Sequence, residues 1–151
     1  MKLAAALQER ADLNKKIADL RSRLEHVILV QEGEKPAEDS GKLIKELEAC
    51  IDRLEYLMVA INRTNSQTTV SGKTLTELIA KKDATRLRIG AYRDFAYEAI
   101  RNTQRARNTE IKVFSVLNAS DLQKKVDACS KELREIDNLL QETNWTCDLI
   151  E

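Results

Sequence analysis

Apolar residues recur along the first thirty positions with the period of a helix that packs along one face. Their spacing alternates between four and three residues, which is the heptad pattern of helices that pack side by side. The positions in this frame are Leu3, Ala6, Arg10, Leu13, Ile17, Leu20, Leu24 and Val27. A helix over residues 2–30 would be about 43 Å long at 1.5 Å per residue. The pattern therefore predicts an elongated hairpin or a subunit interface.

A second heptad stretch begins near Lys42 and has a wider apolar face. Its main line consists of Leu43, Leu47, Cys50, Leu54, Leu57 and Ile61. A flanking stripe of Ile44, Ile51 and Met58 repeats at every seventh residue. One partner helix covers a single line of side chains, so the wide face predicts a second neighbour, supplied by a bundle or by an oligomer.

The segments around these two helices are polar. Gly33 is expected to end the first helix and Pro36 to prevent its continuation, which makes residues 30–39 a hairpin connection. Residues 62–73 contain β-branched residues and a glycine, and they are expected to form a loop or a short exposed strand.

Two further helices follow in the second half of the chain. Thr74 with Glu77, and Ser120 with Gln123, match the capping box that starts a helix. The apolar residues of the third helix are Leu75, Leu78, Ile79, Leu87, Ile89, Tyr92, Phe95 and Ile100. Those of the fourth, which is expected to end near Thr143, are Leu122, Val126, Cys129, Leu133, Ile136 and Leu140.

Residues 110–117 are the best strand candidate, and they could pair with residues 68–71. The elements together predict a mainly α fold. We expect long antiparallel helices that form a helical bundle or coiled-coil-like hairpins, with a small two-stranded β ribbon, in one domain over residues 1–151.

Composition agrees with this fold class and restricts the cellular location. Of the 151 residues, 33% are charged and 4% aromatic, with four glycines and one proline, as in chains dominated by helix formers. No apolar run approaches the roughly 18 residues of a membrane span, and the first residues turn polar too early for a signal peptide. Three cysteines without a CxxC pair indicate reduced thiols. These features predict a cytosolic protein with no membrane partner.

Charge is zero overall but segregated along the chain. Residues 25–55 hold nine acidic and four basic side chains, and residues 81–112 hold nine basic and four acidic ones. Opposite patches of equal size favour docking within the chain or between copies. The basic stretch, with its aromatic residues, could instead contact nucleic acid. Because no nucleic-acid-binding motif accompanies it, we predict no nucleic-acid partner.

Candidate chemistry is sparse. His26 is the only histidine, so one chain cannot build a catalytic triad or a site with several histidine ligands. The segment Ser71-Gly72-Lys73-Thr74 looks like the end of a phosphate-binding loop, but position 67 is Gln67 where that motif requires glycine. A capped turn is the alternative. We predict no cofactor.

Two polar regions remain as candidate sites. The acidic turn holds Glu32, Glu34, Glu38 and Asp39, which could bind a hard cation or simply keep a hairpin connection in water; whether a metal binds is left open. Trp145 follows a heptad helix, and it is expected to fill the end of a bundle or a subunit interface rather than stack on a ligand.

Several blocks of the sequence are characteristic when taken in order. They are KLAAALQERADLNKKIADLRSRL, VQEGEKPAED, INRTN followed by GKTLTELIAKKD, and LREIDNLLQETNWT. Together they resemble a family of small bacterial proteins of unknown function, some of which carry the name septicolysin. The likeness covers nearly the whole chain, and residues 94–120 match least.

This resemblance implies a helical homo-oligomer, for example a hexamer built as a trimer of dimers, and it brings no enzyme assignment. The name implies a pore-forming cytolysin. The polar residues of the matching blocks are candidates for a surface that binds a ligand or partner: Gln31, Glu32, Glu34, Asn62, Thr64, Asn65, Asn144, Trp145 and Thr146.

The sequence thus favours a non-enzymatic cytosolic protein that assembles with itself and binds a ligand or partner. Two alternatives stay open at this point. One is a septicolysin-like pore-forming toxin, and the other is an enzyme or metal-binding protein with a site at the polar turns.

Overall fold

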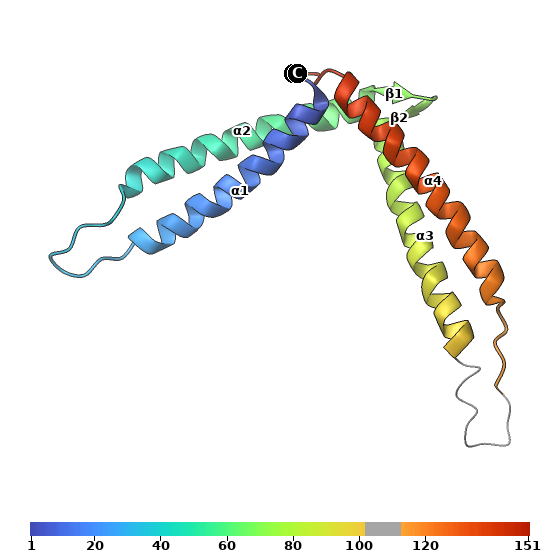
Figure 1. Ribbon diagram of the computed structural model, residues 1–151. Helices are drawn as coiled ribbons and strands as arrows, with labels where there is room; N and C mark the ends of the chain where they lie inside the picture. Colours follow the sequence, from blue (N-terminus) through green and yellow to red (C-terminus); the bar gives the residue numbers. More distant parts are fainter. Residues whose placement is uncertain (102–112) are drawn as a thin grey trace. The chain divides into compact units, whose positions relative to one another are not determined.

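The computed structural model describes residues 1–101 and 113–151 and has a mainly α fold. Its elements, in chain order, are α1 (Leu3–Val27), α2 (Ser40–Gln67), β1 (Thr69–Val70), β2 (Lys73–Thr74), α3 (Leu75–Arg101) and α4 (Ala119–Thr146) (Figure 1). The two short strands pair with each other. The predicted fold class, long helices with a small two-stranded ribbon, is confirmed. No described helix is long and apolar enough to cross a membrane.

The chain divides into two compact units. The first comprises Met1–Thr69 and Thr143–Glu151, and the second comprises Val70–Glu142. A helical hairpin forms the body of each unit: α1 with α2 in the first, and α3 with most of α4 in the second (Figure 1). That the whole chain acts as a single domain stays a prediction.

In the first hairpin, α1 and α2 pack along the two heptad lines that the sequence predicts. Leu20 and Leu57 are completely buried, and Cys50 is 6% exposed. Salt bridges join Glu9 to Arg53 and Lys16 to Glu46. Because the later residue of α1 pairs with the earlier residue of α2, the two helices are antiparallel.

Several predicted boundaries in this half of the chain are wrong. The first helix ends at Val27, and Gly33 lies in the following connection with φ +87°. The second helix begins at Ser40, because Asp39 Oδ1 accepts hydrogen bonds from the amides of Gly41 and Lys42 at 3.0 and 3.2 Å.

Residues 62–67, predicted as a loop, form the last turns of α2. Thr64 explains this continuation. It lies three residues beyond Ile61 on the buried line and is itself fully buried. Tertiary packing thus overrides the polar composition of this segment.

The segment between α2 and α3 is a tight β hairpin. Ser71 and Gly72 both adopt positive φ, +52° and +76°, between the paired strands. The predicted capping box at Thr74 is confirmed: the Glu77 carboxylate accepts from the Thr74 amide at 2.7 Å, and the Glu77 amide donates to Thr74 Oγ1 at 3.2 Å. The Thr74 amide and hydroxyl both donate to the Glu77 carboxylate, and this holds the pKa of Glu77 below its usual 4.5. The fragment that looked like a phosphate loop is a turn followed by a cap.

The predicted strand over residues 110–117 is not formed where the structure describes it. Residues 110–112 lie outside the described part, and residues 113–117 form no strand. Instead, β1 pairs with β2, from which only Ser71 and Gly72 separate it. This short connection costs less loop-closure entropy than pairing with a distant strand.

The fourth helix starts and ends differently from its prediction. Its N-terminal cap is Asn118, whose Oδ1 accepts from the amides of Ser120 and Asp121 at 2.8 and 3.3 Å. Ser120 is therefore inside the helix, and the capping box predicted there is wrong. The helix also continues past Thr143 to Thr146.

In the second hairpin, α3 meets α4 through a partly polar face. Thr85 is fully buried, with its hydroxyl donating to the Lys81 carbonyl at 2.8 Å, whereas Leu87 is 76% exposed and Phe95 50%. The antiparallel helices are joined by salt bridges from Lys81 to Glu132 and from Lys82 to Asp137, both at 2.5 Å.

Two Leu→Ala substitutions should measure how strongly the buried heptad residues of α2 stabilise the first hairpin. Leu57→Ala is expected to lower the free energy of unfolding by about 2–5 kcal/mol, because it opens a cavity at a fully buried position. Leu87→Ala is the matched control, since it makes the same change at a residue of α3 that is 76% exposed. Chemical denaturation of both variants measures the difference, and equal losses would contradict the packing.

Candidate functional site

The acidic turn lies at the free end of the α1–α2 hairpin (Figure 1). Gln31, Glu32 and Glu34 are exposed there, and the Glu34 amide donates to the Gln31 carbonyl at 3.0 Å. This part of the candidate surface is a solvated connection between helices.

The other two acidic residues of the turn have structural partners. Arg23 donates two hydrogen bonds to Glu38, one from Nε at 3.0 Å, and this holds the pKa of Glu38 below its usual 4.5. Asp39 caps α2. Across residues 1–101 and 113–151, no three His, Cys, Asp or Glu side chains converge to hold a metal ion.

The second group of candidate residues lies where the chain termini meet. An antiparallel bridge joins Lys2 to Asp148: the Leu3 amide donates to the Cys147 carbonyl at 3.0 Å, and the Leu149 amide donates to the Met1 carbonyl at 2.7 Å. We call this pairing of residues 1–3 with residues 147–149 the terminal clasp. Leu149 is only 8% exposed.

Thr64 connects α2 to the clasp. Its hydroxyl donates to the Ala60 carbonyl at 2.8 Å and accepts from the Ile150 amide, also at 2.8 Å. A donor and an acceptor are thus both satisfied at a fully buried site, which gives Thr64 a structural role. Asn62 is exposed and Asn65 half-buried on the same turns.

The end of α4 supplies the remaining candidates. Lys2 Nζ donates to the Thr146 carbonyl at 2.9 Å and forms a salt bridge with Asp148 at 3.0 Å. Asn144 is half-buried. Trp145 is 71% exposed, so the prediction that it fills the end of a bundle is wrong within this chain; its place in a subunit interface stays a prediction.

The candidate residues therefore fall into two places. At the clasp, the end of α2 contacts the C-terminal residues: Thr64 accepts from the Ile150 amide, and the Thr68 hydroxyl lies 3.6 Å from the Cys147 thiol. The connection between α1 and α2, which contains Gln31, Glu32 and Glu34, lies at the opposite end of the hairpin (Figure 1).

A surface that was not selected as a site from the sequence is the stripe of Ile44, Ile51 and Met58 on α2. These side chains are 46%, 46% and 48% exposed. An open groove at its C-terminal half is lined by Ile51, Leu54, Glu55, Met58, Val59 and Asn62. The seven-residue repeat was the available signal, and the exposures show that this stripe faces solvent in the chain.

The stripe lies on the side of α2 opposite its ion pairs. An α-helix turns about 100° around its axis with each residue. Around the axis of α2, Ile51 therefore lies about 100° from the buried Cys50, and Arg53 lies about 60° from Cys50 in the opposite direction. Arg53 reaches Glu9 at 2.7 Å, which lowers the pKa of Glu9, and its guanidinium lies 5.1 Å from the Tyr56 ring centre. Ion pairs line one side of the hairpin, and uncovered apolar side chains line the other.

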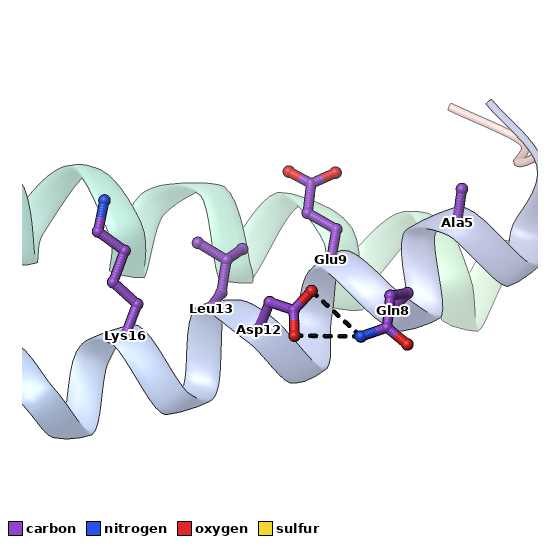
Figure 2. Close-up of a pocket in the computed structure, with 6 residues that line it drawn as sticks. All are labelled: Ala5, Gln8, Glu9, Asp12, Leu13 and Lys16. Atoms are coloured by element: carbon purple, nitrogen blue, oxygen red, sulfur yellow. Dashed lines mark hydrogen bonds between the residues drawn. The ribbon is translucent and has the colours of Figure 1, made fainter.

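A second groove follows α1. Figure 2 shows its lining residues, Ala5, Gln8, Glu9, Asp12, Leu13 and Lys16, with the Gln8 amide donating to both Asp12 carboxylate oxygens at 3.1 Å. This groove and the groove on α2 are each lined by one helix alone. Pockets for small ligands enclose most of the ligand surface, so these open grooves are better suited to a partner helix.

The fold and these surfaces define a mainly helical protein built on two hairpins. The chain belongs to a family of unknown function, DUF6847, whose sequence pattern matches residues 10–149. It is also similar to a functionally unknown conserved protein from Corynebacterium diphtheriae, known from a crystal structure. The two are 34% identical, with a TM-score of 0.89 and 99% of each chain covered.

No curated protein matches the chain. The resemblance described above is thus confirmed at the level of an uncharacterised family, and neither match supports the name septicolysin.

The link between Thr64 and the clasp can be tested with a nearly isosteric change. Thr64→Val is expected to lower the free energy of unfolding by about 1–3 kcal/mol, because the Ile150 amide loses its acceptor. It should also accelerate hydrogen exchange of that amide, measured by NMR. Thr64→Ser keeps the hydroxyl, so the Ile150 amide should stay as protected from hydrogen exchange as in the wild type. If that amide is equally protected in Thr64→Val, this role of Thr64 is contradicted.

The clasp should also be sensitive to acid. The salt bridge with Lys2 holds the pKa of the Asp148 carboxyl below its usual 3.8. The stabilisation of the folded state by this salt bridge is therefore fully present above pH 3.8, and it is lost as the pH falls through the lower pKa of Asp148 in the folded state. NMR titration of the Asp148 carboxyl should show this lowered pKa and its return toward 3.8 in Lys2→Met. An unchanged pKa in that variant would show that the two side chains do not interact in solution.

Proposed function

We propose that this protein is a non-enzymatic helical protein that assembles with itself through the stripe of Ile44, Ile51 and Met58. The observation that carries the proposal is the half-exposure of three large apolar side chains in heptad register. A line of this kind is what a helix presents to a second partner helix in a bundle or coiled coil. Covering it would remove apolar surface from water, which is the main favourable term in protein association.

The surroundings of the stripe favour a protein partner over lipid. Glu48, Asp52 and Glu55 lie beside it and are exposed. Helices that lie on membranes usually carry lysine and arginine around their apolar face, because cell membranes present anionic lipids. An acidic border is therefore suited to a soluble helix with basic groups.

We also propose that the protein works in the cytosol. Support comes from its three free cysteines, Cys50, Cys129 and Cys147. Cys50 is buried on the heptad line of α2, where a reduced thiol packs as a small hydrophobic side chain.

Native mass spectrometry and sedimentation equilibrium should test the assembly. The wild-type protein is expected at a multiple of the 17.2 kDa chain, the number of subunits being read from the mass. Ile51→Glu should shift it toward the single chain with unchanged helix content by circular dichroism, because a charge replaces the centre of the stripe.

Ala49→Glu is the matched control, since it adds the same charge to an exposed position of α2 away from the stripe. A wild-type protein that stays at 17.2 kDa across concentrations would overturn the proposal, as would equal effects of the two substitutions. Release of dye from liposomes by the wild type would instead favour the cytolysin that the septicolysin name implies.

A further inference from the structure

The side chains around the stripe on α2 specify the charge of its partner. Glu48 and Glu55 are seven residues apart and therefore lie on one line beside Ile51 and Met58. Neither carboxylate forms an ion pair within the described parts of the chain, and the same holds for Asp52. Among the described residues, the border of the stripe thus holds three carboxylates without an ion pair, against the single ammonium group of the exposed Lys45.

Two copies of α2 packed on each other would satisfy the apolar residues but not these charges. In an antiparallel pair centred on Ile51, Glu48 of one copy would approach Asp52 and Glu55 of the other. A parallel pair would place each carboxylate opposite its own copy. Like charges in contact across an interface oppose association, so the partner should be a helix with a basic border.

The exposed side of α3 provides such a helix. Ile79, Arg86, Arg93 and Ile100 follow one another at intervals of seven residues, so they form one line along the helix. Around the axis of α3, this line lies about 100° from the fully buried Thr85. The stripe on α2 lies at the same angle from the buried Cys50 around the axis of α2.

The residues of this line are accessible. Ile79 is 37% and Ile100 57% exposed, and the neighbouring Tyr97 is 64% exposed. Arg93 is exposed and forms no ion pair with any described residue, and Arg86 has only an exposed contact of 4.0 Å with Asp83. We call Ile79, Arg86, Arg93 and Ile100 the basic line.

The two surfaces also match in period and length. Arg86 and Arg93 are separated by seven residues, as Glu48 and Glu55 are, so both pairs span about 10.5 Å along a helix axis. Two arginines can therefore meet two glutamates at once, while their aliphatic stems cover the apolar side chains between them. The basic line is about 32 Å long and the stripe from Ile44 to Met58 about 21 Å, so α3 can cover the whole stripe.

We propose that the apolar stripe on α2 binds the basic line on α3 of a second copy of this chain. This inference rests on the self-association proposed above and identifies the surface that the stripe binds. Each contact joins two different surfaces, and a reciprocal dimer with two such contacts covers both surfaces of both chains. Arg86 and Arg93 then pair with Glu48 and Glu55.

Charge reversal on each surface tests this assignment. Glu48→Lys combined with Glu55→Lys, and Arg86→Glu combined with Arg93→Glu, should each weaken self-association by about tenfold or more, because each places like charges in contact. Sedimentation equilibrium measures the dissociation constants. Lys124→Glu combined with Lys131→Glu is the control: these residues are exposed on α4 with the same seven-residue spacing, and their reversal should leave the association within about twofold.

Mixing the two reversed proteins is the decisive step. In an equimolar mixture, the lysines on α2 of one protein meet the glutamates on α3 of the other, and the unchanged surfaces meet in the second contact. Assembly should recover to near the wild-type affinity, although each protein alone stays dissociated. The single chain with all four reversals should recover as well.

The outcomes separate this inference from the proposed function. A monomeric wild-type protein would overturn both. If Ile51→Glu dissociates the assembly but Arg86→Glu with Arg93→Glu does not, self-association stands and the basic line is not the partner. Recovery in the four-reversal chain without recovery in the mixture would place the contact within one chain and overturn the inference.

Discussion

Apolar contact along two heptad lines is the interaction on which the first hairpin depends. Leu20, Leu24 and Val27 of α1 form one buried cluster with Leu43 and Cys50 of α2. The ion pairs at the border lie at half-exposed side chains, where each contributes little. A two-helix hairpin gives each helix one neighbour, so a helix with a wide apolar face keeps part of it in water. The exposed Ile44, Ile51 and Met58 are the direct result of this geometry.

The terminal clasp addresses a different problem, since chain ends fray unless they are tied down. The Leu3 and Leu149 amides pair with carbonyls of the opposite terminus, and Thr64 accepts from the Ile150 amide. Residues that looked like a ligand surface in the sequence are thereby used partly for closure. The exposed Asn62 and Trp145 remain on the outside of this closed end.

Charge has two roles in the described structure, although the formal net charge is zero. Within each hairpin, salt bridges such as those of Lys16 with Glu46 and Lys81 with Glu132 link the two facing helices. The exposed Glu48 and Arg93 form no such pair among the described residues. Exposed charged groups such as these contribute more to the choice of a binding partner than to the stability of the fold.

The sequence by itself determined the helices and one of their caps, the capping box that Thr74 and Glu77 form at the start of α3. Both the heptad period and this cap depend on residues only a few positions apart, so a local pattern is enough to predict them. The tertiary structure decided the buried role of Thr64, the exposure of Trp145 and the clasp. Each of these depends on contacts between residues far apart in the chain, such as Thr64 with Ile150, and a local pattern carries no information about them. The sequence likewise showed the second stripe on α2, but only the packing of the hairpin decided that it faces solvent, because α1 covers the other line.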